Sequence, residues 1–575
     1  MYAKSRIIRI VFLYISLSSA LLGVYGSTSN SVIAQTKYND IFSEEGGREN
    51  FLAPMEQGFQ NKLDPKVVDK IAQSANELEE ALKENGKQLF ITALPILPTN
   101  NVKGNSRALA NEVTFPPSAP PSTINWEGNV RVSGRAGIQT EPDIISSEIN
   151  DGNLVAAVID YSSGSVLCRL ASSTNAGVSW IDRGNMQVPP GTSFLGDPVL
   201  ATNSKGHFIA TCIAWDTDTN GNPTSSAIIM QVSKDNGATW SSPTIVIGST
   251  SDISPIFHDK PWIASDPNVH SPWRDRTYMC WTKFDDPVGT SKIVVKRIQE
   301  SIGFQKTLVT AGLDLTDRVQ GCNIAVGPRG EVAVAWFQAN PTDPSTQARI
   351  KVSRSYDGGI SWTSPVTVGT LTKIPACIVS GGGNGCLDGK DGKFRVNQFP
   401  EITWDRLDNL LVTYTSYAAG NADIMFKSSS SCATPSGSCI FSSPIKVNDD
   451  GTSRDQFFPA IVASDKVTAV DDRGIVHIVA QDKRESTDNL SWRPWSYHCN
   501  LSSGCDTSAK WSGSNPQVPV SFDLFSNTGV SFFVGDYNGL TTGDGVVSSS
   551  SKQAHAIWFD NVDNVPDVYS DRTTN

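Results

Sequence analysis

Three arginines occupy the same place in a repeated segment of this chain. Arg318, Arg395 and Arg454 each stand five residues before the start of an apolar, strand-like run. A guanidinium group is a planar fork of donors that binds carboxylates in pairs, so three such groups together suit an anionic ligand. Amide side chains stand three residues before the same runs: Gln320, Asn397 and Gln456. The pattern predicts a site that binds a carboxylate.

Charged residues also stand one position before several of these runs. They are acidic in Glu141, Asp197 and Asp536, and basic in Lys260. Equivalent positions of a ring of repeats converge, so we expect a mouth lined by arginines, amides and carboxylates. A structural role is the alternative, because repeats copy packing contacts as readily as functional ones. Each arginine would then bind loop carbonyls or a neighbouring aspartate such as Asp455.

The elements that must position these residues are β-strands. From about residue 125 the chain consists of short β-branched runs separated by turns such as NSKG, GPRG and DDRG. Seven runs begin alike: TEPDIISS, GDPVLATN, DKPWIASD, GCNIAVGP, QFPEITWD, FFPAIVAS and GDYNGLTT. Radial repetition of such units predicts an all-β, seven-bladed β-propeller over residues 125–575. Six blades is the alternative, if two starts share one blade.

The two ends of this region predict how the ring closes. The segment GNVRVSG (128–134) is similar to the outer strands PTIVIGS and SPIKVND, yet it precedes the first unit. The seventh unit ends the chain with little sequence left for an outer strand. We therefore expect segment 128–134 to complete the last blade, which removes the open sheet edges.

An eight-residue phrase occurs three times: STNAGVSW (173–180), SKDNGATW (233–240) and SYDGGISW (355–362). Its acidic or amide residue binds nearby backbone N–H groups, and its glycine adopts a turn conformation closed to other residues. The tryptophan then packs the turn onto the blade. The residues concerned are Asn175, Gly177 and Trp180, then Asp235, Gly237 and Trp240, then Asp357, Gly359 and Trp362.

This phrase resembles the Asp-box, or bacterial neuraminidase repeat, of sialidase-like β-propellers. The resemblance covers about 440 residues and implies that the phrase is a structural turn between the third and fourth strands of a blade, away from the central site. Sialidases hold the carboxylate of their sugar with three arginines and use a tyrosine nucleophile, its glutamate partner and an aspartate acid/base. By that resemblance Tyr537 is the candidate nucleophile, Asp259 the acid/base and Glu141 the group that activates the tyrosine.

The sequence departs from that family in its first blade. Catalytic sialidases carry an Arg-Ile-Pro phrase there, and this chain has QTEPDII instead. Two functions from different classes therefore stay open: a glycosidase acting on an acidic sugar, and a non-catalytic surface propeller that binds glycans or a protein. A purely structural envelope component is a third.

The N-terminal part predicts export. Residues 1–34 combine a basic start, an apolar stretch and a small-residue cleavage site, which is typical of a signal peptide, with an uncleaved anchor as the alternative. Residues 35–124 contain one amphipathic helix, DPKVVDKIAQSANELEEALKENG, and a Pro-rich linker. No second apolar stretch is long enough to span a membrane, so the mature protein is expected to be secreted or on the cell surface.

Charge and cysteine content support this interpretation. The net charge of −11 without a basic stripe argues against a nucleic-acid partner. Ten cysteines in an exported chain favour disulfides, and three local pairs are expected: Cys377–Cys386, Cys432–Cys439 and Cys499–Cys505. No metal or other cofactor is expected; a weak calcium alternative lies at Asn384, Asp388 and Asp391.

Overall fold

The computed structural model of the chain describes residues 126–135, 137–219, 223–250, 256–285, 290–299, 308–309, 319–339, 346–376, 385–389, 392–435, 438–464, 474–514, 533–542, 553–560 and 567–573. All of them belong to the second of two compact units, Phe115–Asn575. The predicted signal peptide (1–34) and the extension with its helix (35–124) lie outside the described residues.

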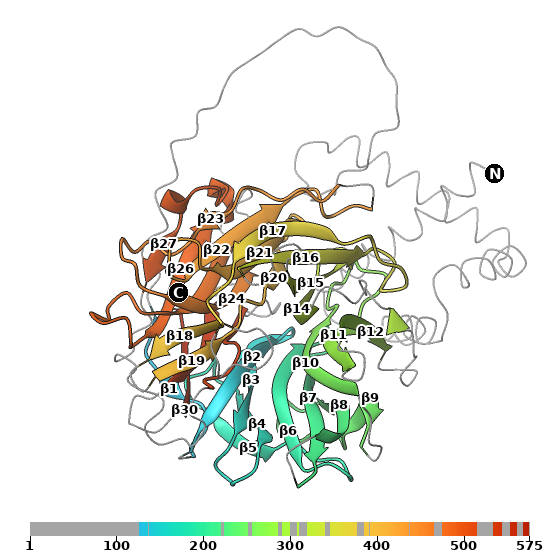
Figure 1. Ribbon diagram of the computed structural model, residues 1–575. Coiled ribbons are helices and arrows are strands. Elements are labelled where there is room, and N and C mark those ends of the chain that lie inside the picture. The colour runs from blue at the N-terminus through green and yellow to red at the C-terminus, as the bar shows by residue number, and fades with distance from the viewer. Residues whose placement is uncertain are drawn as a thin grey trace, which may run out of the picture. The chain divides into compact units, whose positions relative to one another are not determined.

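The described residues form seven four-stranded antiparallel sheets arranged in a ring (Figure 1). Blade 1 contains β2 (Gln139–Ser147), β3 (Asn150–Asp160), β4 (Leu167–Ser173) and β5 (Ile181–Asn185). Blade 2 contains β6 (Phe194–Thr202), β7 (Phe208–Thr217), β8 (Pro223–Ser233) and β9 (Thr244–Ser249). Blade 3 contains β10 (Ile256–Ser265), β11 (Arg276–Asp285), β12 (Thr290–Gln299) and β13 (Leu308–Val309).

Blade 4 contains β14 (Val319–Val326), β15 (Val332–Ala339), β16 (Gln347–Ser355) and β17 (Val366–Thr372). A separate hairpin, β18 (Gly385–Gly389) and β19 (Gly392–Val396), is inserted before blade 5. Blade 5 contains β20 (Glu401–Trp404), β21 (Leu410–Ser416), β22 (Asp423–Ser429) and β23 (Ile445–Lys446). Blade 6 contains β24 (Gln456–Ser464), β25 (Ile475–Asp482), β26 (Arg493–Asn500) and β27 (Ser512–Ser514), with short 3₁₀ turns at Leu501–Ser503 and Ser508–Lys510.

Blade 7 joins the two ends of the ring. Its strands are β28 (Gly539–Thr542), β29 (Ala554–Asp560), β30 (Asp567–Arg572) and, as the outer strand, β1 (Val130–Arg131). Val130 pairs with Ser570, so the N-terminal strand completes the last blade as the sequence predicts. The first strand of every blade contacts that of the next, and β28 contacts β2. The prediction of seven blades is confirmed, and the six-bladed alternative is wrong.

The blades hold together by stacking their apolar faces. The middle strands are apolar on both faces because each lies between two neighbouring blades, as in β15, where seven of the eight residues are buried. The apolar clusters accordingly combine strands of adjacent blades, such as blades 2 and 3 around Trp281 and Ile228. No helix within the described ranges is long and apolar enough to cross a membrane.

The repeated phrase forms the same turn in blades 1, 2 and 4. In blade 2, Asp235 accepts hydrogen bonds from the Ser233 hydroxyl (2.8 Å) and from the Thr239 backbone N–H (2.9 Å), and Gly237 has a φ of +78°. Each turn joins the third strand to the fourth and packs on the preceding blade, with Trp240 against the core between blades 1 and 2. The phrase therefore ties neighbouring blades together.

Disulfides connect blades as well as loops. The predicted bridges Cys432–Cys439 and Cys499–Cys505 are confirmed. Cys386 is disulfide-bonded, and its predicted partner Cys377 lies outside the described residues. Four cysteines in strands, which the sequence left unassigned, form two bridges between adjacent blades: Cys168–Cys212 and Cys280–Cys322.

Candidate functional site

A bulge at one register of the first strands creates the candidate site. The strand pairing shifts at this place in blades 1, 2, 3, 4 and 6. The bulged residues all have positive φ: Glu141 (+50°), Asp197 (+49°), Lys260 (+49°), Gly321 (+64°) and Phe458 (+54°). A left-handed backbone changes the direction in which the side chain of a bulged residue points. Blades 1, 2 and 3 therefore each direct a charged side chain towards the centre of the ring.

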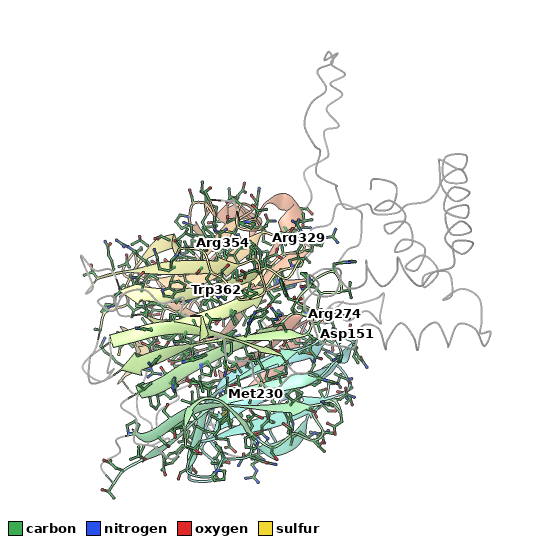
Figure 2. All side chains as sticks on the ribbon, turned by 90° about the vertical axis from the view of Figure 1, so that its right-hand side faces the viewer. Asp151, Met230, Arg274, Arg329, Arg354 and Trp362 are labelled. Carbon is green, nitrogen blue, oxygen red and sulfur yellow. A yellow bond between two sulfur atoms is a disulfide. The ribbon has the colours of Figure 1, made fainter. Side chains whose placement is uncertain are left out.

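The site lies at the end of the blades away from the repeated turns. Asp151, Arg274 and Arg329, at or beside the turns between first and second strands, lie along one side of the molecule (Figure 2). The repeated phrase connects the third strand of a blade to the fourth. In an antiparallel sheet this connection lies at the same end of the blade as the turn between the first and second strands. Glu141 and Asp197 stand near the starts of their strands, so their side chains belong to the opposite side.

An ion pair joins the inserted hairpin to blade 7. The Arg395 guanidinium donates to Asp536 Oδ1 (2.7 Å), and its centre lies 4.4 Å from the centre of the Phe533 ring. Asn397 Nδ2 donates to the carbonyl oxygen of Asp536 (2.7 Å). Burial alone would raise the pKa of Asp536, but the charges of Arg395 and Lys260 outweigh it and hold that pKa below its usual value. Asp536 is therefore an ionised carboxylate.

The pKa of Asp259, in the third blade, is shifted in the opposite direction to that of Asp536. Burial, and then the charges of Asp197 and Asp536, raise its pKa to about 7, although Lys260 and Arg395 act against this. Its side chain is nevertheless partly exposed. Gln320 Nε2 donates to Asp259 Oδ2 (3.3 Å). This carboxyl group therefore retains its proton to a higher pH than an ordinary aspartate does.

Glu141 is the most deeply buried acid of the cluster. Burial raises its pKa well above the usual value, and the charges of Asp197 and Asp536 raise it further. Its carboxyl group lies beside that of Asp197, and two carboxylates in contact do not both ionise. The carboxyl group of Glu141 therefore favours its protonated form more strongly than an ordinary glutamate does.

Tyr537 is enclosed within the ring. Its side chain is 5% exposed, and its hydroxyl donates to the carbonyl oxygen of Pro198 (2.9 Å). Burial and then the charge of Glu141 raise its pKa well above the usual value. The predicted pair of Tyr537 and Glu141 is thus in one electrostatic cluster, with the tyrosine hydroxyl engaged elsewhere. Its role as nucleophile stays a prediction.

Only part of the predicted anion site is brought together. Arg395 belongs to the cluster, together with Asn397 and Gln320. The Arg454 guanidinium instead donates to the carbonyl of Thr487 within its own blade. Gln456 also bonds outside the cluster: it accepts from Asn448 Nδ2 in the connection between blades 5 and 6 (2.8 Å) and donates to Asp482 Oδ1 (3.1 Å). Arg318 lies outside the described residues.

Five members of the cluster were not assigned a role of their own from the sequence: Asp197, Lys260, Asp536, Tyr161 and Phe533. Asp197, Lys260 and Asp536 share the position of Glu141, and that shared position was the available signal. Tyr161 directly follows β3, and burial and then the charge of Glu141 raise its pKa. Nothing in the sequence around Tyr161 and Phe533 indicates that they approach the axis.

The arrangement can support acid/base chemistry. Within the described ranges, no three His, Cys, Asp or Glu side chains are placed to hold a metal ion. Of the calcium candidates, Asp388 pairs with Lys393 Nζ (3.0 Å), and Asn384 and Asp391 lie outside the described residues. Two carboxyl groups whose pKa values are shifted in opposite directions, upwards in Asp259 and downwards in Asp536, can supply the proton donor and the base that bond cleavage requires.

Comparisons with known proteins give structural neighbours only. No family model matches the chain, and no curated protein matches it. An α-L-arabinanase of Penicillium chrysogenum in complex with arabinobiose is 14% identical, covers 66% of this chain and 99% of its own, and has a TM-score of 0.42. An intramolecular trans-sialidase of Ruminococcus gnavus is 12% identical over 62% of this chain and 92% of its own, with a TM-score of 0.37. An ulvan lyase of polysaccharide lyase family PL25 is 10% identical over 76% of this chain and 95% of its own, with a TM-score of 0.42.

Proposed function

We propose that this chain is an exported propeller that acts on glycans and cleaves a glycosidic bond at the cluster around Asp259 and Asp536. The supporting observation is that these two acids, both partly exposed, lie in one electrostatic cluster that shifts their pKa values in opposite directions, upwards in Asp259 and downwards in Asp536. Glycoside hydrolysis uses such a pair, one acid that protonates the leaving oxygen and one carboxylate on the other side of the bond. The four disulfides between described residues favour an oxidising, extracytoplasmic compartment.

In the proposed reaction Asp259 gives its proton to the glycosidic oxygen as the bond breaks. Asp536 either removes a proton from the attacking water or attacks the anomeric carbon itself, and one water is consumed for each bond cleaved. Asn397 and Arg395 fix Asp536 from the hairpin, so its carboxylate is oriented before substrate arrives. Charged groups that are oriented in advance lower the barrier without reorganising during the reaction.

The sialidase-like form of the proposal adds two features. The substrate is an acidic sugar, whose carboxylate binds the guanidinium donors of Arg395 that Asp536 leaves unused. Tyr537 is then the attacking group, after its hydroxyl leaves the Pro198 carbonyl. The three turns with Asp-box sequence support this form because they are the motif of sialidase-like propellers.

A glycan-binding propeller without turnover is the second candidate. The observation that favours it is the engagement of Tyr537 with Pro198 and of Arg454 with Thr487. In that case Arg395 and the carboxyl groups would hold the hydroxyl and acidic groups of a sugar, and no bond would be cleaved.

The test compares the mature protein with Asp259→Asn, Asp536→Asn and Tyr537→Phe on a panel of fluorogenic neutral and acidic glycosides. Asp259→Asn and Asp536→Asn should each lower kcat by about 10²–10⁴-fold, the usual contribution of a proton-transfer group. Activity of the wild type should fall above about pH 7, because Asp259 then loses the proton it must donate. Asp259→Asn should lack this alkaline limb.

Asp506→Asn is the matched control, because Asp506 is an exposed acid of blade 6, with 63% of its side chain accessible. It should retain wild-type turnover. Loss of turnover in Tyr537→Phe would support the sialidase-like form, and full turnover there would favour Asp536 as the base or nucleophile. Binding of a glycan without hydrolysis, weakened in Asp536→Asn, would replace the hydrolase by the binding propeller.

A further inference from the structure

A lysine lies buried at the centre of the carboxyl cluster. Lys260 is 3% exposed, and its ammonium group makes no hydrogen bond to any described residue. Three aromatic rings surround it instead: Nζ lies 3.8 Å from the ring centre of Tyr537, 5.6 Å from that of Phe399 and 6.0 Å from that of Trp262. Cation–π attraction strengthens when the cation is desolvated, so the rings partly replace the water that burial removes.

The backbone of Lys260 is fixed as firmly as its head group. The residue occupies the bulge of β10 with a φ of +49°, and its N–H donates to Asp197 Oδ2 of the neighbouring blade (3.0 Å). A left-handed lysine is strained, and such a conformation persists only where the surroundings determine it. Asp197 and the aromatic cage are these surroundings.

The ammonium acts on acids of four blades. Its charge favours the ionised form of carboxyl groups in blades 1, 3, 5 and 7, namely Glu141, Asp143, Asp259, Glu401 and Asp536. The charges of Asp197 and Asp536 oppose it, because they favour protonation of Asp259, whereas the cation of Arg395 acts in the same sense as Lys260. Gln320 is a neutral donor to Asp259.

We propose that Lys260 is a positioning residue of this site, whose caged ammonium sets which of the converging carboxyl groups hold a proton. Without this charge the cluster would retain four acids, Glu141, Asp197, Asp259 and Asp536, against the single cation of Arg395. Repulsion would then push protons onto Asp259 and Asp536 together, and the difference between donor and base would shrink. The effect of Lys260 on catalysis rests on the proposed function, whereas its effect on the protonation of the acids does not.

Lys260→Met tests the proposal because methionine keeps the length and apolar stem of lysine without its charge. Lys296→Met is the matched control: Lys296 is also buried in blade 3 (2% exposed), but its ammonium donates to the Val246 carbonyl. The first measurement is an infrared pH titration of the carboxylic acid band in D₂O. The spectrum of Asp259→Asn, and of the corresponding double variants, is subtracted to isolate Asp259.

The midpoint assigned to Asp259 should lie near pH 7 in the wild type and in Lys296→Met. It should move up by about 1 pH unit in Lys260→Met, the lower end of the shift that an adjacent opposite charge produces. Asp197→Asn should move it down, because a repelling charge is removed. Opposite shifts in these two variants do not arise from general loosening of the fold. An unmoved midpoint in Lys260→Met would overturn the proposal.

The second measurement is the pH profile of glycoside hydrolysis, whose alkaline limb should move up together with the infrared midpoint in Lys260→Met. An infrared shift without any turnover in the wild type would refute the proposed function and leave the role of Lys260 intact. Turnover whose alkaline limb does not move in Lys260→Met would leave the proposed function intact and refute the role of Lys260. If Lys260→Met does not fold, Lys260→Gln, which keeps a hydrogen-bonding head group, is measured in the same way and should give the same upward shift.

Discussion

Closure of the ring by the N-terminal strand predicts a large effect from a single tryptophan. Trp126 is 3% exposed and packs against Val479, Trp558 and Tyr569, so it joins blades 6 and 7. Its indole N–H donates to Ser496 Oγ (2.8 Å). Replacing a buried tryptophan by alanine costs about 3–5 kcal/mol, and the lost hydrogen bond about 1 kcal/mol more. Trp126→Ala should therefore lower the free energy of unfolding by about 4–6 kcal/mol.

This loss of stability should produce a measurable decrease in the melting temperature. Unfolding entropy is about 2 cal/mol/K per residue, so the second unit, of about 450 residues, has roughly 1 kcal/mol/K, and Tm should fall by about 5 °C. Hydrogen–deuterium exchange should also accelerate in β30, because its pairing with β1 weakens and a sheet edge opens. Differential scanning calorimetry and exchange mass spectrometry measure the two effects.

Trp511→Ala is the matched control for this prediction. Trp511 is equally buried (4% exposed), but it packs on Phe426 between blades 5 and 6. Its loss should lower Tm to a similar extent and leave exchange in β30 unchanged. If Trp126→Ala melts like the wild type and β30 stays protected, the N-terminal strand does not hold the ring closed, and the reasoning is wrong.

Two further predictions concern the contacts between blades. Asp235→Ala should lower the free energy of unfolding by about 1 kcal/mol, because the turn loses a part-buried hydrogen bond to Ser233 and an exposed one to Thr239. Asp235→Asn should recover most of this loss; urea denaturation measures both. The double change Cys168→Ser and Cys212→Ser should cost about 4 kcal/mol in the chain-entropy estimate, since the bridge spans 44 residues, and thermal melts in oxidised and reduced buffer should converge in the variant.

The fold was predictable from sequence because its signals are local. A turn residue, an alternation of apolar residues and a repeated start are each read within about ten residues, and every blade carries its own copy. The closure was predictable for a related reason: segment 128–134 has the pattern of an outer strand and lacks its own blade. The bridges Cys168–Cys212 and Cys280–Cys322 were not predictable, because each joins strands of different blades and depends on how these stack.

The candidate site was predictable only in part, and the arginines explain why. Arg395 and Arg454 have the same spacing from the next proline, but Arg395 lies on the inserted hairpin β18–β19, whereas Arg454 directly precedes β24. The hairpin carries Arg395 to Asp536, and Arg454 remains beside Thr487 in its own blade. Counting residues assumes that equal spacing means equal geometry, and an insertion breaks this assumption.

The bulges distinguish a site from a scaffold. A non-glycine residue with positive φ costs of the order of 1 kcal/mol or more, and burying a charge costs further free energy. Blade 4 adopts the same bulge with Gly321, which avoids both costs. Blades 1, 2 and 3 instead place Glu141, Asp197 and Lys260 there, and Glu141 interacts electrostatically with both Asp197 and Lys260. Blade 6 adopts the same bulge with the buried, uncharged Phe458, so the strain by itself also occurs in the scaffold. The combination of this strain with a charged side chain in three consecutive blades is what distinguishes the site.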